Sequence, residues 1–363
     1  VEAAKMLLVL AGYDADKAGL VGSNWSTNTL KYAGAAGILD DVVSGLESGL
    51  PRQYAAQMIY NTLDTNRVKW STDSDSFDDV LNGGIKETVG HAYMGLCADY
   101  GTLTTITSDS LTIMIDSSYD SDNHHQYEDH KSGVSFSKVG TDYSSLLGQK
   151  VKVMFKDGKT NNVLGVYAIS DNTVYETYLN KTERDGDKIK FGGSSYSVDD
   201  VDNIKTIIDG AAAVPKTLDY FNDTAENKKS MNKVVFVDTN SNNKIDTAII
   251  TTYVGGEVTY VGSDKITFAG ESYEFDDENI DEEIVKDDFA VMSENLYEDC
   301  KDIVRADILT TELTGIKEKT GYWQYELDGT WYNAAEEADV DTGDTVKAYV
   351  YNGIALDISA DDS

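Results

Sequence analysis

The sequence predicts a multidomain protein in which an N-terminal all-α segment precedes several small all-β modules, each a hairpin-built sandwich or a partly open barrel. Three observations predict this fold class: a helical spacing of apolar residues near the start, a strand-like alternation after it, and an internal repeat. We expect a helical domain at 1–66, a linker at 67–85, and β-modules at 86–180, 181–256, 257–314 and 315–363, with a merger of the last two as the alternative.

The expected helices lie at residues 1–10, 25–39 and 50–63. Pro51 opens the third, where a first helical turn tolerates a missing N–H. Apolar or small residues then recur every three to four positions, as in a helix with one buried face: Tyr54, Ala55, Met58, Ile59, Thr62 and Leu63. The segment is therefore expected to be a bundle of short helices.

The pattern after residue 86 alternates apolar and polar residues, as β-strands do. Residues 101–115 alternate around a Ser-Asp-Ser turn and predict a hairpin. Three further hairpins are predicted from paired strands, of which two flank turn dipeptides: 151–155 with 163–169 around Asp157-Gly158, 234–237 with 247–253, and 346–351 with 354–358 around Asn352-Gly353.

An internal repeat supports a string of similar modules. Residues 187–200 align without gaps on 264–277, and nine of the fourteen positions are identical. Weaker echoes occur at 110–119 and 322–332. Each copy has two apolar-alternating strands around a small turn, so we interpret the repeat as the duplication of a fold unit and not of an active site.

The composition favours an acidic, extracellular protein. The 30 basic and 64 acidic residues give a formal net charge of −34 and a pI near 4.2, which excludes nucleic acid as a partner. A divalent cation is an expected companion of any assembly, because it screens this charge. No run of eighteen apolar residues is present, so no membrane span is expected. No signal peptide is visible, and an export signal is expected to have been removed or to lie outside this sequence.

Two cysteines, Cys97 and Cys300, are far apart in the sequence. One long-range disulfide is an open alternative, but two buried thiols that act as small apolar side chains are the favoured interpretation.

Histidines gather in one short tract, which holds His124, His125 and His130. Such a tract could bind Zn²⁺ or Ni²⁺. A solvent-exposed polar loop is favoured, because no HExxH register appears and the flanking residues are small and polar.

The tract 238–246 resembles the first nine positions of a Ca²⁺-binding EF-hand loop, with oxygen ligands expected from Asp238, Asn240, Asn242 and Asp246. Asn243 replaces the turn glycine, and Ile249 occupies the place of the bidentate acid. A polar hairpin loop with weak calcium binding is the favoured interpretation. Acidic runs at 276–283 and 336–344, with 199–202 beside them, are further candidates for collecting Ca²⁺ between molecules, although such runs usually mark a solvated face.

Sequence motifs of enzymes are missing. The chain has no glycine-rich phosphate loop, no dinucleotide fingerprint and no Gly-x-Ser-x-Gly elbow. His91 is the remaining histidine and is expected on a strand face. The protein is therefore expected not to be an enzyme and to require no cofactor, with Ca²⁺ as the one candidate.

The first 66 residues resemble the S-layer homology (SLH) family, whose modules hold surface proteins to bacterial cell walls. Trp25, the alanine-rich run 33–39 and residues 50–56 follow the order of the family's repeat, and Arg52 matches its motif arginine. Pro51 and Tyr54 depart from the motif's threonine and glutamate, and residues 1–4 resemble the end of a preceding repeat.

This resemblance implies secretion, a Gram-positive-type envelope and non-covalent binding to a wall polysaccharide, with Trp25 and Arg52 as the ligand-facing candidates. The alternative places Trp25 in the core and Arg52 in a salt bridge.

Two function classes follow from these observations. The first is a non-enzymatic cell-surface protein that anchors to the wall and assembles with copies of itself into an S-layer-like lattice or filament. The second is a wall-anchored adhesin that displays a ligand-binding β-region.

Overall fold

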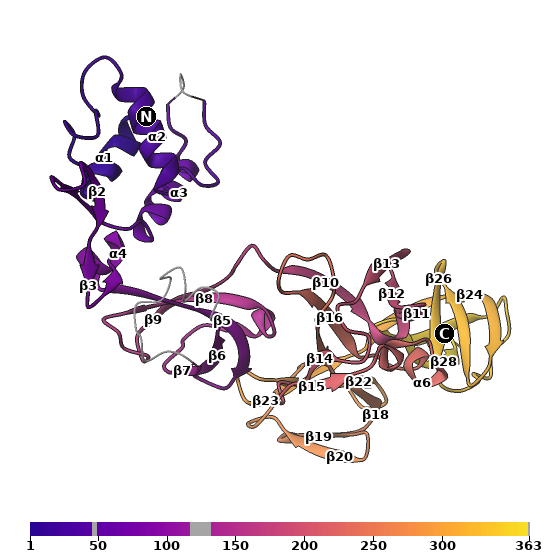
Figure 1. Ribbon diagram of the computed structural model, residues 1–363. Coiled ribbons are helices and arrows are strands. Elements are labelled where there is room, and N and C mark those ends of the chain that lie inside the picture. Colours follow the sequence, from indigo (N-terminus) through magenta and orange to yellow (C-terminus); the bar gives the residue numbers. More distant parts are fainter. Residues whose placement is uncertain (46–48, 117–131, 362–363) are drawn as a thin grey trace. The chain divides into compact units, whose positions relative to one another are not determined.

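The computed structural model describes residues 1–45, 49–116 and 132–361 (Figure 1). Strands hold 45% of the residues and helices 15%, so strand pairing sets most of the architecture. The chain divides into two compact units. The first comprises Val1–Gly101, Met114–Val139 and Lys152–Tyr167, and the second comprises Thr102–Ile113, Gly140–Val151 and Ala168–Ser363.

The first unit begins with three short helices, α1 (Glu2–Leu10), α2 (Trp25–Ala35) and α3 (Arg52–Leu63). Each helix contributes small or apolar side chains from one face to a shared cluster, as its sequence spacing requires. The helices are held together because this cluster removes their apolar faces from water. The buried members of the cluster are Ala4, Leu8, Ala18, Leu20, Ala33, Ile38 and Met58.

The prediction of an all-α N-terminal segment is wrong. Two strands that follow the helices, β1 (Val68–Ser71) and β2 (Ser76–Asp79), form an antiparallel hairpin. Phe77 of β2 packs against the helical cluster, with its ring centroid 4.9 Å from that of Tyr13 and 5.9 Å from that of Tyr32. The segment is therefore a mixed helix-and-strand structure.

Backbone contacts join the same hairpin to the helices. The N–H of Val68 donates to the carbonyl oxygen of Ala11 at 2.8 Å. The hairpin lies in the range 67–85 that was expected to be a linker, so these residues carry part of the core instead of connecting two finished domains. The elements that follow are short: β3 (Leu81–Asn82), β4 (Ile85–Lys86) and α4 (Val89–Met94).

The rest of the described chain forms β-modules that share a plan of five strands, some of which are divided in two. The first module, residues 96–168, has its strands in the order β7-β6-β5-β8-β9, so its first strand lies between its second and fourth. The boundary between the two compact units runs through this module. Its elements are β5 (Leu96–Ile106), β6 (Leu111–Ile115), β7 (Gly133–Phe136), η1 (Ser144–Leu146), β8 (Lys150–Lys156) and β9 (Val163–Ala168).

The second module, residues 173–251, has the same connectivity with two interruptions. A 3-10 turn, η2 (Leu179–Lys181), divides the first strand, whose halves pair with the fourth and the second strand. The third strand is divided as well, and its later part, β14, pairs in parallel with β17. The elements are β10 (Thr173–Tyr178), β11 (Glu183–Asp185), β12 (Lys188–Phe191), β13 (Ser194–Ser197), β14 (Ile204–Ile208), β15 (Val214–Lys216), η3 (Leu218–Phe221), α6 (Ala225–Lys228), β16 (Lys233–Asp238) and β17 (Thr247–Thr251).

The third module, residues 254–305, follows the same plan in the order β20-β19-β18-β22-β23-β21. The short strand β21 pairs in parallel with β23, as β14 does with β17. The strands are β18 (Val254–Val261), β19 (Lys265–Phe268), β20 (Glu271–Glu274), β21 (Asn279–Ile280), β22 (Phe289–Asn295) and β23 (Cys300–Arg305).

The fourth module, residues 307–360, closes into a barrel in the order β24-β25-β26-β28-β27. Its third and fifth strands run in parallel, and the first pairs with both the second and the fourth. This is the strand order of OB-type barrels. The strands are β24 (Asp307–Lys319), β25 (Tyr322–Leu327), β26 (Thr330–Ala334), β27 (Thr345–Tyr351) and β28 (Ile354–Ala360).

The repeated sequences fold into the same hairpin. β12 and β13 pair with Ile189 opposite Tyr196, and β19 and β20 pair with Ile266 opposite Tyr273. Both turns have two central residues with positive φ, as type I′ hairpin turns do: Gly192 and Gly193 in one copy, Ala269 and Gly270 in the other. The weaker echo at 322–332 forms an equivalent hairpin, in which Tyr325 lies opposite Tyr332.

An apolar joint connects the last three modules. It contains Met231 from the second module, Val291 and Ala306 around the third, and Tyr349 and Ile354 from the fourth. All five side chains are buried, so these modules pack into one body within the second unit.

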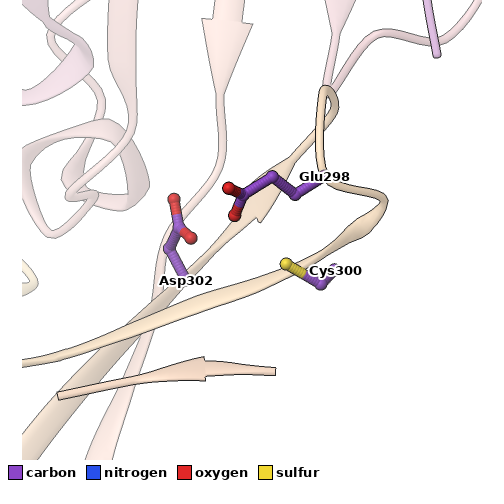
Figure 2. A group of neighbouring side chains, drawn as sticks. All are labelled: Glu298, Cys300 and Asp302. Carbon is purple, nitrogen blue, oxygen red and sulfur yellow. The ribbon is translucent and has the colours of Figure 1, made fainter. Parts of the chain in front are cut away.

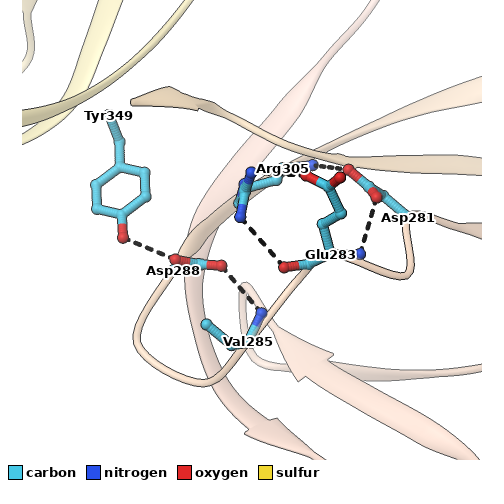
Figure 3. A network of polar contacts seen from close by, with 6 residues as sticks. All are labelled: Asp281, Glu283, Val285, Asp288, Arg305 and Tyr349. Carbon is cyan, nitrogen blue, oxygen red and sulfur yellow. Dashed lines mark hydrogen bonds and ion pairs between the residues drawn. The ribbon is translucent and has the colours of Figure 1, made fainter. Parts of the chain in front are cut away.

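A buried carboxylate adds a polar bond to this joint, as Figure 3 shows. The Tyr349 hydroxyl donates to Asp288 Oδ1 at 2.8 Å, and the Val285 N–H donates to Asp288 Oδ2 at 2.9 Å. Burial raises the pKa of the Tyr349 hydroxyl, and its hydrogen bond to Asp288 adds to the rise. Nearby, Arg305 Nη2 donates to Glu283 Oε2 at 2.8 Å and fixes the loop that carries Asp288.

The two copies of the hairpin turn provide a matched pair of substitutions. We expect Ala269→Gly to stabilise the protein and Gly192→Ala to destabilise it, each by about 0.5–1 kcal/mol. A Cβ in the left-handed region costs roughly 1–2 kcal/mol, whereas a glycine loses about 0.4–1 kcal/mol through the entropy of the unfolded chain. Urea unfolding measures both. Shifts of the same sign in the two variants would contradict the shared turn geometry.

Removal of the Tyr349 hydroxyl tests the polar bond of the joint. Tyr349→Phe leaves Asp288 Oδ1, in a side chain that is only 4% exposed, without its donor. We expect a loss of about 1–3 kcal/mol in the free energy of unfolding, the cost of an unsatisfied buried acceptor. Tyr260→Phe is the control, because Tyr260 is 49% exposed. Equal stability of the two variants would show that the bond contributes nothing.

Candidate functional site

The candidate calcium loop, residues 238–246, connects β16 to β17. These strands pair antiparallel, with Val237 opposite Thr247 at the base of the loop. Asp238 ends β16 with a side chain that is only 1% exposed, and Ile245 anchors the other end of the loop in the core of the second module. Both ends of the loop are thus fixed by packed residues.

Side-chain oxygens of the loop turn inward to its backbone. Asp238 Oδ2 accepts the N–H of Asn243 at 2.7 Å, and Asp238 Oδ1 accepts that of Asn240 at 3.1 Å. Asn240 and Asn242 accept in turn from N–H groups two residues further on, at 3.2 Å and 2.9 Å. Asn243 has a φ of 61°, as the turn position of such a loop requires. The predicted replacement of glycine by asparagine is therefore accommodated.

The last predicted ligand, Asp246, closes the loop. Its Oδ2 accepts from both the N–H and the hydroxyl of Thr239 at 2.9 Å, and its Oδ1 accepts from the Thr247 hydroxyl at 2.6 Å. Asp246 thus joins the loop's two ends. An ionised carboxylate has about four acceptor sites, so these bonds leave capacity for a cation.

Asp199 is an acid of the same site that lies far from the loop in sequence. The amide Nδ2 of Asn242 donates to Asp199 Oδ1 at 3.2 Å. A parallel bridge between Val198 and Ile245 holds it there. In the sequence, Ile249 occupies the position at which an EF-hand loop has its bidentate acid. In the structure, Ile249 lies within β17. The structure places the carboxylate of Asp199 beside the loop through the hydrogen bond from Asn242.

The loop thus carries carboxylate and amide oxygens, the kind of ligand that Ca²⁺ takes in proteins. Among the described residues, the carboxylates of Asp199, Asp238 and Asp246 do not form a group within 4.8 Å of one another. The hydrogen bonds of the loop also satisfy it without any ion, so a preformed polar hairpin and a weak calcium site are both compatible with this geometry. Calcium binding stays a prediction.

A second cluster combines two carboxylates and a thiol, as Figure 2 shows. The ligand atoms of Glu298, Cys300 and Asp302 lie within 4.8 Å of one another. The Asn295 amide donates to Glu298 at 3.2 Å and to Asp302 at 3.1 Å, and Asn279 donates to the same two carboxylates.

Burial, chiefly, raises the pKa of the Cys300 thiol in this cluster, and the neighbouring carboxylates raise it further. The neutral thiol, a small half-buried side chain, is thus favoured. Cys97 is fully buried and Cys300 is half-buried, and no disulfide joins them. The favoured interpretation of two buried thiols therefore holds for Cys97 and only in part for Cys300.

An acidic cavity of about 290 Å³ lies in the second unit. Its single lysine, Lys233, is paired with Glu176 at 3.3 Å, which leaves the remaining carboxylates in excess and suits a cationic ligand better than an anion. The acidic residues that line it are Asp142, Glu176, Asp209, Glu294 and Asp302.

The predicted wall-binding residues begin two different helices. Trp25 opens α2, is partly exposed, and has the ammonium of Lys5 5.6 Å from its ring centroid. Arg52 opens α3, is exposed, and forms no ion pair with any residue that the structure describes. The alternative of a core tryptophan and a salt-bridged arginine is thus not what is observed. Binding to a polysaccharide stays a prediction.

The histidine tract with His124, His125 and His130 lies outside the described residues. His91 was expected on a strand face but lies in helix α4, where its N–H donates to Thr88 Oγ1 at 3.2 Å. Within the described ranges, no helix is long and apolar enough to cross a membrane.

Comparison with known proteins finds no family model and no curated protein that matches this chain. The resemblance to the SLH family therefore stays a prediction.

Sequence reasoning missed Asp199 as a partner of the calcium loop, and it missed the carboxylate–thiol cluster. The alternation Glu298-x-Cys300-x-Asp302 was a usable signal, because alternate residues of an extended chain share one face. Asp199 was marked in the sequence only as part of the acidic run 199–202, and its place beside the loop follows from strand pairing.

Calcium titration of the purified chain tests the loop. We expect binding with a Kd of about 10⁻⁴–10⁻³ M, as for weak extracellular calcium modules, and a rise in melting temperature with added Ca²⁺. Asp246→Asn should weaken binding at least severalfold, because it removes a charged ligand. Asp187→Asn, on an exposed turn, should leave it unchanged. A melting temperature that calcium does not change would contradict the site.

Proposed function

We propose that this chain is a non-enzymatic structural protein that associates with copies of itself into a lattice or filament at a cell surface. The observation that carries the proposal is the recurrence of one strand order in four consecutive modules. Repeated modules with a common plan lengthen the molecule and present similar surfaces several times along it, as tandem arrays do.

The residues that recur between copies support this proposal. The shared apolar positions of the repeated hairpins, Ile189 and Phe191 in one copy and Ile266 and Phe268 in the other, are buried core residues. The repeat therefore preserves core positions that hold each module together. It also preserves exposed polar positions, among them Asp187, Ser195 and Asp199 of the first copy.

The strand order alone does not assign a function, because OB-type barrels serve many. Their frequent use in binding nucleic acids is opposed here by the net charge of −34. We include attachment to a wall polysaccharide in the proposal, with Trp25 and Arg52 as the contacting residues. A monomeric adhesin that binds a ligand through its β-region is the competing function.

Negative-stain microscopy and sedimentation velocity of the purified chain test the proposal. We expect ordered fibres or arrays whose amount grows with protein concentration and with added Ca²⁺, because cations screen the acidic surfaces.

A monodisperse monomer at every protein and calcium concentration would contradict self-assembly. If such a monomer bound a glycan or a host protein, the adhesin function would be favoured.

A further inference from the structure

The four modules differ in whether another strand pairs with the outer edge of their fifth strand. In the second module, β14 covers the edge of β17 in parallel, from Lys205 opposite Thr247 to Ile208 opposite Ile250. In the third module, β21 covers the edge of β23 in the same way. In these two inner modules, a strand of the same module therefore pairs with the outer edge of the fifth strand.

The fourth module is less complete. β28 meets β26 through a single parallel pair, Asn333 opposite Ile354. The opposite edge of β28 pairs with β27, but residues 355–360 have no backbone partner on the β26 side within the described chain. Their outward N–H and C=O groups can accept another strand.

The first module also has a free edge at its fifth strand. Its fifth strand, β9, ends the order β7-β6-β5-β8-β9, and no described residue pairs with its outer edge. Within the described residues, the fifth strand of the first module thus has one unpaired edge, and that of the last module is unpaired on its β26 side after Ile354.

A groove runs beside the free edge of β28. It has a volume of about 380 Å³ and lies between residues 334–338 and 354–358. Its lining is apolar at Ala334, Ala335 and Ile358, whereas Glu336 and Glu337 are exposed and give it an acidic rim. Lys229 also lines it and is paired with Glu226 at 2.9 Å.

The outer edge of β9 has complementary features. Leu164 is 54% exposed and offers apolar surface on one face of the strand. Tyr167, 46% exposed, lies on the other face, with its ring centroid 6.2 Å from that of Tyr60. Lys156, which ends β8, and Lys159, in the turn before β9, are exposed and form no ion pair with any described residue. An apolar strand with a basic flank matches an apolar groove with an acidic rim.

We propose that β9 of one copy adds as a strand to the free edge of β28 in the next copy, with Leu164 in the groove and Lys156 and Lys159 facing Glu336 and Glu337. This inference rests on the proposed self-association and names its contact surface. Since the two edges differ, the contact is heterologous and extends into an open chain of molecules rather than closing as a symmetric dimer.

Two variants of the full-length chain test the contact. Leu164→Glu places an acid on β9 opposite the acidic rim, and Ala335→Trp fills the groove from an exposed position. By sedimentation velocity, we expect each variant alone to associate at least about tenfold more weakly than the wild type, a change of about 1.4 kcal/mol. An equimolar mixture should form dimers that grow no further, because each variant keeps one intact edge.

Matched controls separate these effects from general damage. Met114→Glu carries the same acid on an exposed residue of β6, a strand that lies between two others, and Ala212→Trp carries the same indole on another exposed loop. Both should assemble as the wild type does. Circular dichroism and melting temperatures should show that all four variants are folded.

The outcomes distinguish the inference from the proposed function. If the wild type assembles and the Leu164 and Ala335 variants assemble equally well, the β9–β28 contact is overturned and self-assembly stands. If the wild type never associates, both are overturned. If the two variants lose association, the controls keep it and the mixture stops at dimers, the contact is supported.

Discussion

The β-modules depend on a first strand that pairs with two neighbours at once. In β24, residues 307–312 pair with β27 and residues 313–319 pair with β25, with a register shift between Leu313 and Gly315. A strand that changes partners has to bend, and bulges and glycines supply the bend. A Cβ on Gly315 would lie 2.7 Å from the Trp331 ring, and a Cβ on Gly101 in β5 would lie 2.2 Å from the carbonyl oxygen of Met114. No side chain fits at either place without rearrangement.

The small size of the modules explains why they need one another. Each module of some fifty to eighty residues encloses a small core, and small cores are marginal on their own. The last three modules therefore share buried apolar side chains at their joint and add buried polar bonds to it. Asn180 donates to the carbonyl oxygens of Ser230 and Asn352, and Asn333 donates to that of Lys228, so amide side chains fix the fourth module to the second.

Local structure was predictable from the sequence and long-range pairing was not. The hairpins β16–β17 and β27–β28 followed from alternation and turn residues and are confirmed, as is the common fold of 187–200 and 264–277. Phe77 lies in a stretch rich in aspartate and serine, so nothing local marked it as part of the helical core. The parallel pairs of β14 and β21 joined residues some twenty to forty positions apart, which periodicity cannot detect. The same limit hid Asp199 from the calcium loop.

Amide hydrogen exchange of the monomeric chain tests most directly whether one strand serves two partners. The account predicts slow exchange along both halves of β24, 307–312 and 313–319, with fast exchange for the outward amides of 355–360. Fast exchange confined to one half of β24 would contradict it, because that half would then lack its partner strand.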